Sequence, residues 1–162
     1  MGFGLWSLVA PRFARRDRKS HEVPVIVRPA TQGDGARCAE IYLVARRLAF
    51  SWHDAETFAL EDFHRAIEDQ EVWVADRHGV VVGFVSFHRP ENLIDNLFID
   101  PPWQRQGLGS RLLETAHTML GDPARLHCLI ANRPARAFYE RNGWVAERSN
   151  RDGTDPYIVF RK

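Results

Sequence analysis

The stretch WQRQGLGSRLL, residues 103–113, carries two glycines one residue apart, between a cluster of Gln and Arg side chains and an amphipathic run. The run predicts a helix that begins near Gly107, because leucines recur after it at helical spacing. The first N–H groups of a helix have no partners within the helix, and with the helix dipole they favour a bound anion. Gly107 and Gly109 have no Cβ, so a phosphate can approach the backbone closely. The stretch therefore predicts a phosphate-binding turn at a helix N-terminus.

Two common phosphate-binding motifs do not fit this turn. A P-loop needs a Lys directly after its last glycine, and none follows Gly109. A dinucleotide-binding fingerprint that starts at Gly107 needs a third glycine where Leu112 stands. The turn also comes late in the chain, whereas the dinucleotide motif opens its domain. The turn therefore belongs to neither class.

The composition indicates one globular domain. The chain has 162 residues, 27% of them charged, and a formal net charge of +1. This charge balance gives no reason to expect a nucleic-acid partner. No apolar run approaches the roughly 18 residues that span a bilayer, so we expect no integral membrane segment. Cys38 and Cys128 have no metal-ligand spacing, and we expect reduced thiols, no metal site and a cytoplasmic protein.

Residues 1–24 differ from the rest of the chain. They place a short apolar piece before five basic residues and two acidic ones, the reverse of the order in a secretory signal. We expect a basic, flexible N-terminal extension. The alternative is a weak contact with a membrane surface or partner through the apolar side chains Phe3, Leu5, Trp6 and Leu8.

Hydrophobic periodicity predicts a single α/β domain with a mixed sheet over residues 25–162. One long helix is expected over 51–70 with Asp54 as its cap, and Leu48 is expected on the inner face of the helix before it. The expected strands cover 25–30, 71–77, 80–87, 92–100, 125–131, 144–148 and 157–162. The expected helices cover 31–50, 51–70, 107–120 and 133–143.

Three segments together resemble the GNAT N-acetyltransferase superfamily, and the resemblance covers about residues 25–162. They are the Q/R-x-x-G-x-G/A match at 104–109, the preceding strand DNLFIDP at 95–101, and the pattern N…A…FYE…NGWV that runs from Asn132 to Val145. The resemblance implies a single-domain GNAT fold, with a mixed, mostly antiparallel sheet of six to seven strands and helices on both faces.

The resemblance implies acetyl-CoA as the cofactor and assigns residues to it. The turn binds the pyrophosphate of coenzyme A, the strand before it binds the pantetheine arm through its backbone, and Asn132 binds the arm from the other side. The residues so assigned are Leu97, Phe98, Ile99, Gln104, Arg105, Gln106, Gly107, Leu108, Gly109, Ser110, Asn132 and Phe138.

The resemblance also implies two proton-transfer residues. Tyr139 matches the general acid of the family, because a phenol can protonate the leaving thiolate across a short hydrogen bond. The alternative for Tyr139 is a purely structural core position. Asp95 stands where many relatives carry a Glu as general base, and a solvated strand carboxylate is its alternative. His88 is a second candidate base.

The segment ARRLAFSWHD stands where the family recognises the amine acceptor, which predicts Phe50, Trp52 and His53 as substrate residues. Their alternative is packing of two helices over the sheet. The polar loop 148–156 is either a rim of the same pocket or a surface turn.

Two functions remain at this stage. The first is an N-acetyltransferase that transfers the acetyl group of acetyl-CoA to a primary amine of a small molecule or peptide, by direct attack in a ternary complex. The second is a non-catalytic acyl-CoA-binding sensor or interaction module. A homodimer stays open, since relatives are often dimers.

Overall fold

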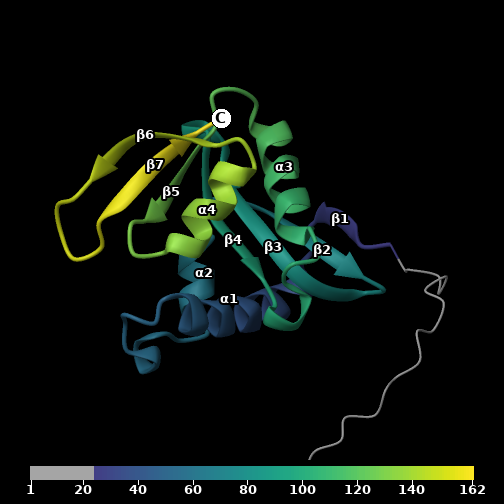
Figure 1. Ribbon diagram of the computed structural model, residues 1–162. Coiled ribbons are helices and arrows are strands. Elements are labelled where there is room, and N and C mark those ends of the chain that lie inside the picture. Colours follow the sequence, from purple (N-terminus) through teal and green to yellow (C-terminus); the bar gives the residue numbers. More distant parts are fainter. Residues whose placement is uncertain (1–23) are drawn as a thin grey trace, which may run out of the picture.

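Seven strands form one twisted sheet in the computed structural model, which describes residues 24–162 (Figure 1). The predictions for the first 23 residues, including the flexible extension and its apolar contact, lie outside the described residues. The strands are β1 Ile26–Pro29, β2 Glu71–Arg77, β3 Val80–His88, β4 Leu93–Ile99, β5 Arg125–Leu129, β6 Val145–Asn150 and β7 Tyr157–Arg161. The helices are α1 Gly35–Ala49, α2 Asp62–Ala66, α3 Leu108–Leu120 and α4 Arg133–Arg141.

The strand order across the sheet is β1-β2-β3-β4-β5-β7-β6. Every neighbouring pair is antiparallel except β4 and β5, which are parallel. The prediction of a mixed, mostly antiparallel sheet is therefore confirmed. The parallel pair is where the two halves of the sheet meet.

The two central strands part soon after they meet. β4 and β5 pair only at Leu93↔Arg125 and Ile94↔Leu126, whereas β3 follows β4 as far as Ile99. Figure 1 shows β4 and β5 diverging beyond this point. The edge of β4 that faces β5 is therefore free of strand pairing after Ile94.

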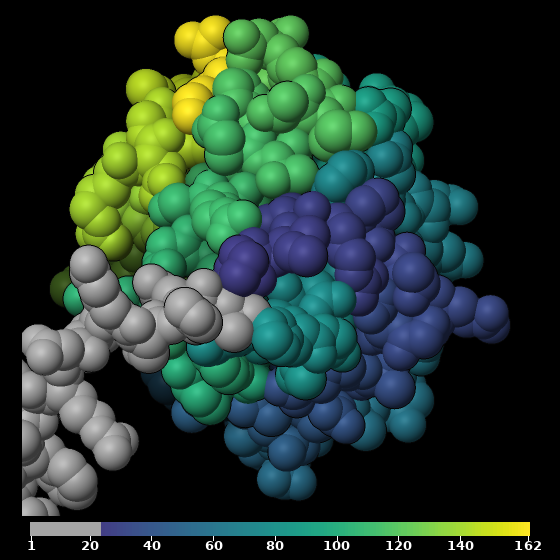
Figure 2. Space-filling model, turned by 90° about the vertical axis from the view of Figure 1, so that its right-hand side faces the viewer, coloured from purple at the N-terminus to yellow at the C-terminus, as the bar shows by residue number. Residues whose placement is uncertain are grey.

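Helices cover the two faces unequally. α3 and α4 pack on one face through a core that includes Leu112, Phe87 and Phe160. α1 and α2 pack on the other face through a second core that includes Tyr42 and Phe84, and this core reaches no further than β4. Figure 2 shows the β1 edge of the sheet, with α3 above β1 and residues of α1 below it. No helix between residues 24 and 162 combines the length and the apolar character that crossing a membrane requires.

The single helix expected over 51–70 is wrong. Asp54 does cap a helical turn, but the turn is a 3₁₀-helix of only three residues, Ala55–Thr57, and α2 follows after a break. At the break Phe58 is extended and buried, with the guanidinium of Arg46 4.2 Å from its ring centre. The carboxylate of Asp62 accepts the Ala59 N–H at 3.0 Å, a local bond that competes with helix continuation. Tertiary burial of Phe58 thus overrides the helical pattern.

Leu48 is also misplaced by the sequence pattern. Its side chain is 66% exposed, while Ile41, Tyr42 and Ala45 are buried as expected. Leu48 lies in the last turn of α1, which ends at Ala49, and it packs in neither of the two cores.

An ion-pair cluster fixes the start of α1 to the sheet. Arg28 on β1 pairs with Asp34 and with Asp76 on β2, each at 2.8 Å. Asp34 also accepts the backbone N–H of Thr31 at 2.7 Å and its hydroxyl at 2.9 Å. The hydrogen bonds from Arg28 are the main cause that holds the pKa of Asp34 below its usual range.

Replacing Asp34 by Asn should lower the free energy of unfolding by about 1–3 kcal/mol at pH 7, since a largely buried charged partner is lost. The pKa of Asp34 is lowered in the folded state, so its contribution is complete above the unfolded value of about 3.9 and is lost as the pH falls through the folded value. The difference between wild type and variant should therefore shrink in acid. Urea unfolding across this pH range, with Asp152→Asn as control, measures it; a difference that grows in acid would contradict the assignment.

Candidate active site

The turn before α3 presents a continuous set of free backbone donors. The first intrahelical bond runs from the Arg111 N–H to the Gly107 carbonyl at 3.1 Å. The N–H groups of residues 105–110 donate to no acceptor within the described chain. Arg105 and Gly107 both have positive φ, 61° and 78°, which turns successive N–H groups toward one side. The turn has the geometry expected of an anion site.

The two glycines of the turn have different structural roles. Nothing lies within 4 Å of a Cβ built on Gly107, so its role is the left-handed conformation and an open surface. A Cβ on Gly109 would stand 3.3 Å from the ring of Phe138, so Gly109 lets α4 approach α3. Phe138 therefore packs behind the turn. The side chain of Gln104 holds the turn to β4 by donating to the Ile99 carbonyl at 3.1 Å.

Two of the three residues expected to bind along β4 face the gap with their backbone. The Asp100 N–H donates to the Val82 carbonyl of β3 at 2.9 Å. Successive residues of a strand direct their backbone groups to alternate sides. Leu97 and Ile99 therefore turn their backbone groups toward the gap, while those of Phe98 face β3. The Phe98 side chain packs with Tyr42, at 5.2 Å between ring centres.

A β-bulge redirects Asp95. Ser86 pairs with Asn96 and Phe87 pairs with Ile94, which leaves Asp95 as the extra residue of β4. Ile94 and Leu97 both pack in the α3 core although they are three residues apart. The two residues between them, Asp95 and Asn96, therefore both face the α1 and α2 side.

A chain of polar side chains holds Asp95 in place. The Asn96 amide donates to the Ser86 hydroxyl at 2.8 Å, Ser86 donates to Gln70, and the Gln70 amide donates to the Asp95 carboxylate at 2.9 Å. Ser86 is fully buried, while the tip of Asp95 reaches solvent. The protein around the carboxylate still removes enough water to raise the pKa of Asp95, and the charge of His88 opposes that shift. His88 itself lies 3.8 Å from Glu91.

Tyr139 lies on α4 over the far side of the sheet. Its ring is 5.8 Å from that of Phe160 on β7 and 5.3 Å from that of Phe138. Burial, and secondarily the nearby Cys128, raise the pKa of Tyr139 well above its ordinary value. The hydroxyl has no partner in the described chain but keeps contact with solvent. It is a neutral phenol with a free proton.

Asn132 has a structural role at the N-terminus of α4. It is the N-cap of α4, and its side-chain oxygen accepts the Ala135 N–H at 3.2 Å. Only its amide N–H groups remain for a ligand. Pro134 in the first turn and the positive φ of Gly143 after the helix agree with the expected start and end of α4.

The residues expected to recognise the acceptor form one aromatic cluster. Phe50 lies 5.4 Å from Trp52 and 6.2 Å from Phe58, measured between ring centres. The imidazole of His53 donates to the Asp155 carboxylate at 2.9 Å, which joins the cluster to the loop between β6 and β7. The structure thus brings the two segments together, although part of the expected loop, up to Asn150, belongs to β6.

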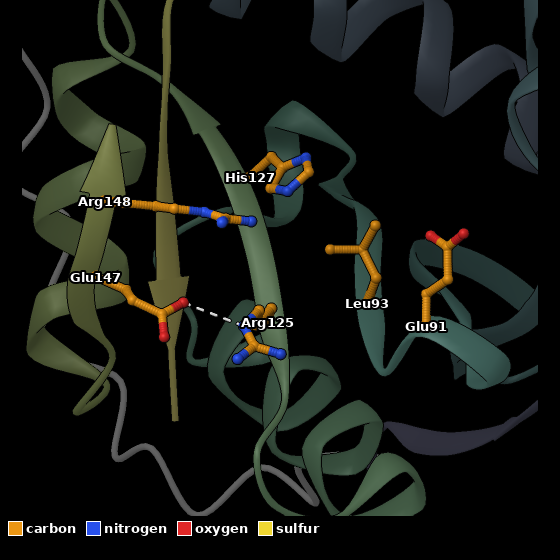
Figure 3. Close-up of a pocket in the computed structure, with 6 residues that line it drawn as sticks. All are labelled: Glu91, Leu93, Arg125, His127, Glu147 and Arg148. Atoms are coloured by element: carbon orange, nitrogen blue, oxygen red, sulfur yellow. Dashed lines mark hydrogen bonds and ion pairs between the residues drawn. The ribbon is translucent and has the colours of Figure 1, made fainter. Parts of the chain in front are cut away.

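Sequence reasoning missed the hollow on the uncovered half of the sheet. Figure 3 shows this hollow of about 570 Å³, lined by Glu91, Leu93, Arg125, His127, Glu147 and Arg148. Only Arg148, at the start of the polar loop 148–156, falls in a segment for which the sequence predicted a possible role at a pocket. His127 alternates with buried Leu126 and Cys128, and that alternation was its only signal in the sequence.

Part of the sequence matches known acetyltransferases. Residues 68–146 match the family model described as "Acetyltransferase (GNAT) domain". The chain is 36% identical over 81 residues to "Uncharacterized N-acetyltransferase YafP" of Escherichia coli, a match that covers 50% of each protein. The chain spans about half the length of the curated relatives it matches, at 50% and 44% of their lengths.

Solved structures agree over more of the chain. The apo-form of YjaB from Escherichia coli superposes with a TM-score of 0.73 at 21% identity, over 85% of this chain and 97% of that one. The PaiA N-acetyltransferase of Thermoplasma acidophilum, solved in complex with coenzyme A, has a TM-score of 0.60 at 18% identity, over 86% and 99%. The fold is that of the GNAT acetyltransferases. Residues 68–146 also match the family model in sequence, so this stretch of the chain is identified as a GNAT acetyltransferase domain.

Replacing Gln70 by Leu should raise the pKa of Asp95 further, because the variant loses an N–H donor that favours the charged carboxylate. Carbon-detected NMR titration of the Asp95 carboxyl measures the change, and Gln32→Leu, an exposed position far from the bulge, is the control. A pKa of Asp95 that falls or stays constant in Gln70→Leu would show that Gln70 does not act on this carboxylate.

Proposed function

We propose that this chain is an acetyl-CoA-dependent N-acetyltransferase that acts on the primary amine of a small molecule or peptide. The observation that carries the proposal is the gap after Ile94 between β4 and β5. Free backbone groups line it, Asp95 stands at one face of the sheet, and Tyr139 lies over the other. An acyl transfer to an amine needs a proton acceptor for the attacking amine and a proton donor for the leaving thiolate.

The turn before α3 fits the pyrophosphate of coenzyme A. The free N–H groups of residues 105–110 and the open surface at Gly107 are what a diphosphate needs at a helix N-terminus. Arg105 adds a cation beside them, with Ser110 in the first helical turn. The coenzyme A complex of the Thermoplasma relative, which shares the fold, supports this choice of ligand.

The edge of β4 fits the pantetheine arm. The backbone groups of Leu97 and the N–H of Ile99 have no strand partner, so an extended amide chain can pair with them as an added strand, while the Ile99 carbonyl already accepts Gln104. The free amide N–H groups of Asn132 offer donors from the far side of the gap. The N–H of Leu97 is our candidate for stabilising the negative charge that develops on the thioester oxygen.

Asp95 and Tyr139 each carry out one of the two proton transfers. Acetyl-CoA supplies the activated acetyl group as a thioester. Asp95, whose pKa is raised by burial, accepts the proton that the amine must lose, directly or through a water. Tyr139 holds its proton at neutral pH and donates it to the departing thiolate. His88 remains the second candidate for the base.

The cysteines support direct transfer without an acyl-enzyme. Both thiols are buried and free, and burial raises the pKa of Cys128 to about 11 and that of Cys38 to about 12. A thiol with such a pKa is not a nucleophile at neutral pH. The cytoplasmic location expected from reduced thiols remains part of the proposal.

Replacing Tyr139 by Phe should lower kcat by about 10²-fold while the affinity for coenzyme A stays within about twofold, because only the proton donor is lost. Thiol release from acetyl-CoA with a panel of amines measures kcat, and the coenzyme A-induced rise in Tm measures binding. Tyr157→Phe, at a tyrosine on the uncovered half of the sheet, is the control. Full activity of Tyr139→Phe would remove Tyr139 from the mechanism.

Tight binding of coenzyme A without turnover of any amine would instead support the non-catalytic module. The presence of both Asp95 and Tyr139 at one gap favours the enzyme.

Gly107→Val should weaken coenzyme A binding at least about tenfold, because a branched side chain covers the free N–H groups and strains a residue with φ of 78°. Gly121→Val is the matched control: Gly121 follows the same helix, has the same φ and has equally open space around it. Both variants should lose stability, but isothermal titration should show weak binding only for Gly107→Val. Equal affinities would place the diphosphate elsewhere.

A further inference from the structure

The half of the sheet formed by β5, β7 and β6 has one face that none of the described helices covers. α3 and α4 pack on the opposite face, and the core beneath α1 and α2 stops at β4. The hollow of about 570 Å³ shown in Figure 3 lies on this open face. A second hollow, of about 300 Å³, continues along β6 and β7 and shares Arg148 with the first.

The cations of the larger hollow are not equivalent. Arg125 pairs with Glu147 at 3.1 Å, and Arg161 approaches the same carboxylate at 3.9 Å. Arg148 has neither an ion pair nor a hydrogen bond with any residue of the described chain. Its side chain reaches across β7 toward His127 on β5 (Figure 3). The charge of Arg148 contributes to lowering the pKa of His127, after desolvation, so the two groups act on each other across the hollow.

His127 is placed to share a ligand with Arg148. Its ring stacks on Tyr157 at 4.7 Å between ring centres, which fixes the orientation of the imidazole. Its ring nitrogens have no hydrogen-bond partner among residues 24–162. A guanidinium and an imidazole N–H that face one hollow without a protein acceptor are the donors that a carboxylate needs.

Strand register places this pair beside the proposed reaction centre. The last paired residues of β4 and β5 are Ile94 and Leu126, so Asp95 and His127 are the next residues of the two strands. Both face the side of the sheet away from α3, Asp95 because of its bulge and His127 by alternation with buried Leu126. The hollow therefore lies where the gap begins, on the side of the proposed base.

We propose that Arg148 and His127 form a subsite for a carboxylate of the acceptor, so that the acceptor is an amine that also carries a carboxylate. The inference rests on the proposed function, because it takes Asp95 as the site of the amine. Arg148 binds a carboxylate in bidentate fashion and His127 donates a further hydrogen bond. Glu91, on the other wall of the hollow, favours the ammonium end of the same molecule and disfavours a second carboxylate there. Leu93 provides an apolar floor between the two ends.

The first experiment compares matched amines. Three amino acids and their decarboxylated counterparts, phenylalanine with phenethylamine, lysine with cadaverine and tryptophan with tryptamine, are assayed at saturating acetyl-CoA. The acid with the extra carboxylate should have the higher kcat/KM in each pair that reacts, by about 10-fold or more, the range of a charge-assisted hydrogen bond. Arg148→Ala should abolish this preference by raising KM for the amino acids. Arg148→Lys should keep part of it.

Arg141→Ala is the matched control, since it removes an equally exposed Arg charge from the last turn of α4 on the other face of the sheet. If the two members of each pair react equally in wild type and in Arg148→Ala, the carboxylate subsite is wrong while the acetyltransferase stands. If no amine reacts although coenzyme A binds, the proposed function fails.

A second measurement does not depend on turnover. With coenzyme A bound, N-acetylphenylalanine should shift the NMR signals of the His127 ring, and N-acetylphenethylamine, which lacks the carboxylate, should not. The shift should disappear in Arg148→Ala and persist in Arg141→Ala. Absence of a carboxylate-dependent shift with the N-acetylated forms of all three amino acids would overturn the subsite.

Discussion

The parting of β4 from β5 is the constraint on which the rest of the structure depends. After Ile94↔Leu126 the strands separate, and the backbone groups of Leu97 and Ile99 lose a sheet partner. Backbone N–H and C=O groups that lack partners must be satisfied by water or by a ligand. The separated strands are kept apart by packing on the α3 side, where Phe138 rests against Gly109 and Tyr139 against Phe160. The fold therefore maintains an open edge at its centre, and that edge accepts an extended ligand.

The bulge in β4 gives the two faces of the sheet at this open edge different ionisable side chains. In a regular strand successive side chains point to opposite faces of the sheet, so the side chains at positions 95 and 96 would lie on opposite faces. The extra residue directs Asp95 to the side opposite Tyr139. The buried hydroxyl of Ser86 and the amide of Gln70 then hold the carboxylate there. A nucleophile can approach from one face while a leaving group departs on the other, which is the geometry that a direct transfer requires.

Much of this fold could be predicted from local patterns, because local rules govern those parts. The turn at His78 and Gly79, where both φ values are positive, joins β2 and β3 where the sequence RHG predicts a hairpin. The helix expected over 51–70 is interrupted at Phe58, because the buried ring of Phe58 packs against Arg46 in another helix, a contact that the local sequence pattern does not contain. The bulge at Asp95 leaves no mark in the alternation of DNLFID, because it is defined by pairing with β3. The sequence gives no signal that His127 belongs to a site, because Arg148, which lines the same hollow, lies on another strand.

The helices leave one face of half of the sheet uncovered, and this explains why the residues that the sequence did not predict as functional cluster on that face. α1 and α2 lie over the strands up to β4, so the open face of β5, β7 and β6 must be polar enough to meet water. Charged side chains there can satisfy that need by pairing with one another, as Arg125 and Glu147 do. Arg148 departs from this arrangement, since solubility alone does not require its guanidinium to extend over β7 toward a stacked imidazole (Figure 3). The edge strand β6 also carries its own bulge at Glu147, and the consecutive residues Glu147 and Arg148 both line the hollow. The open face is thus organised around a positive centre next to the gap, and selection of the acceptor by charge is the role that such a centre fits.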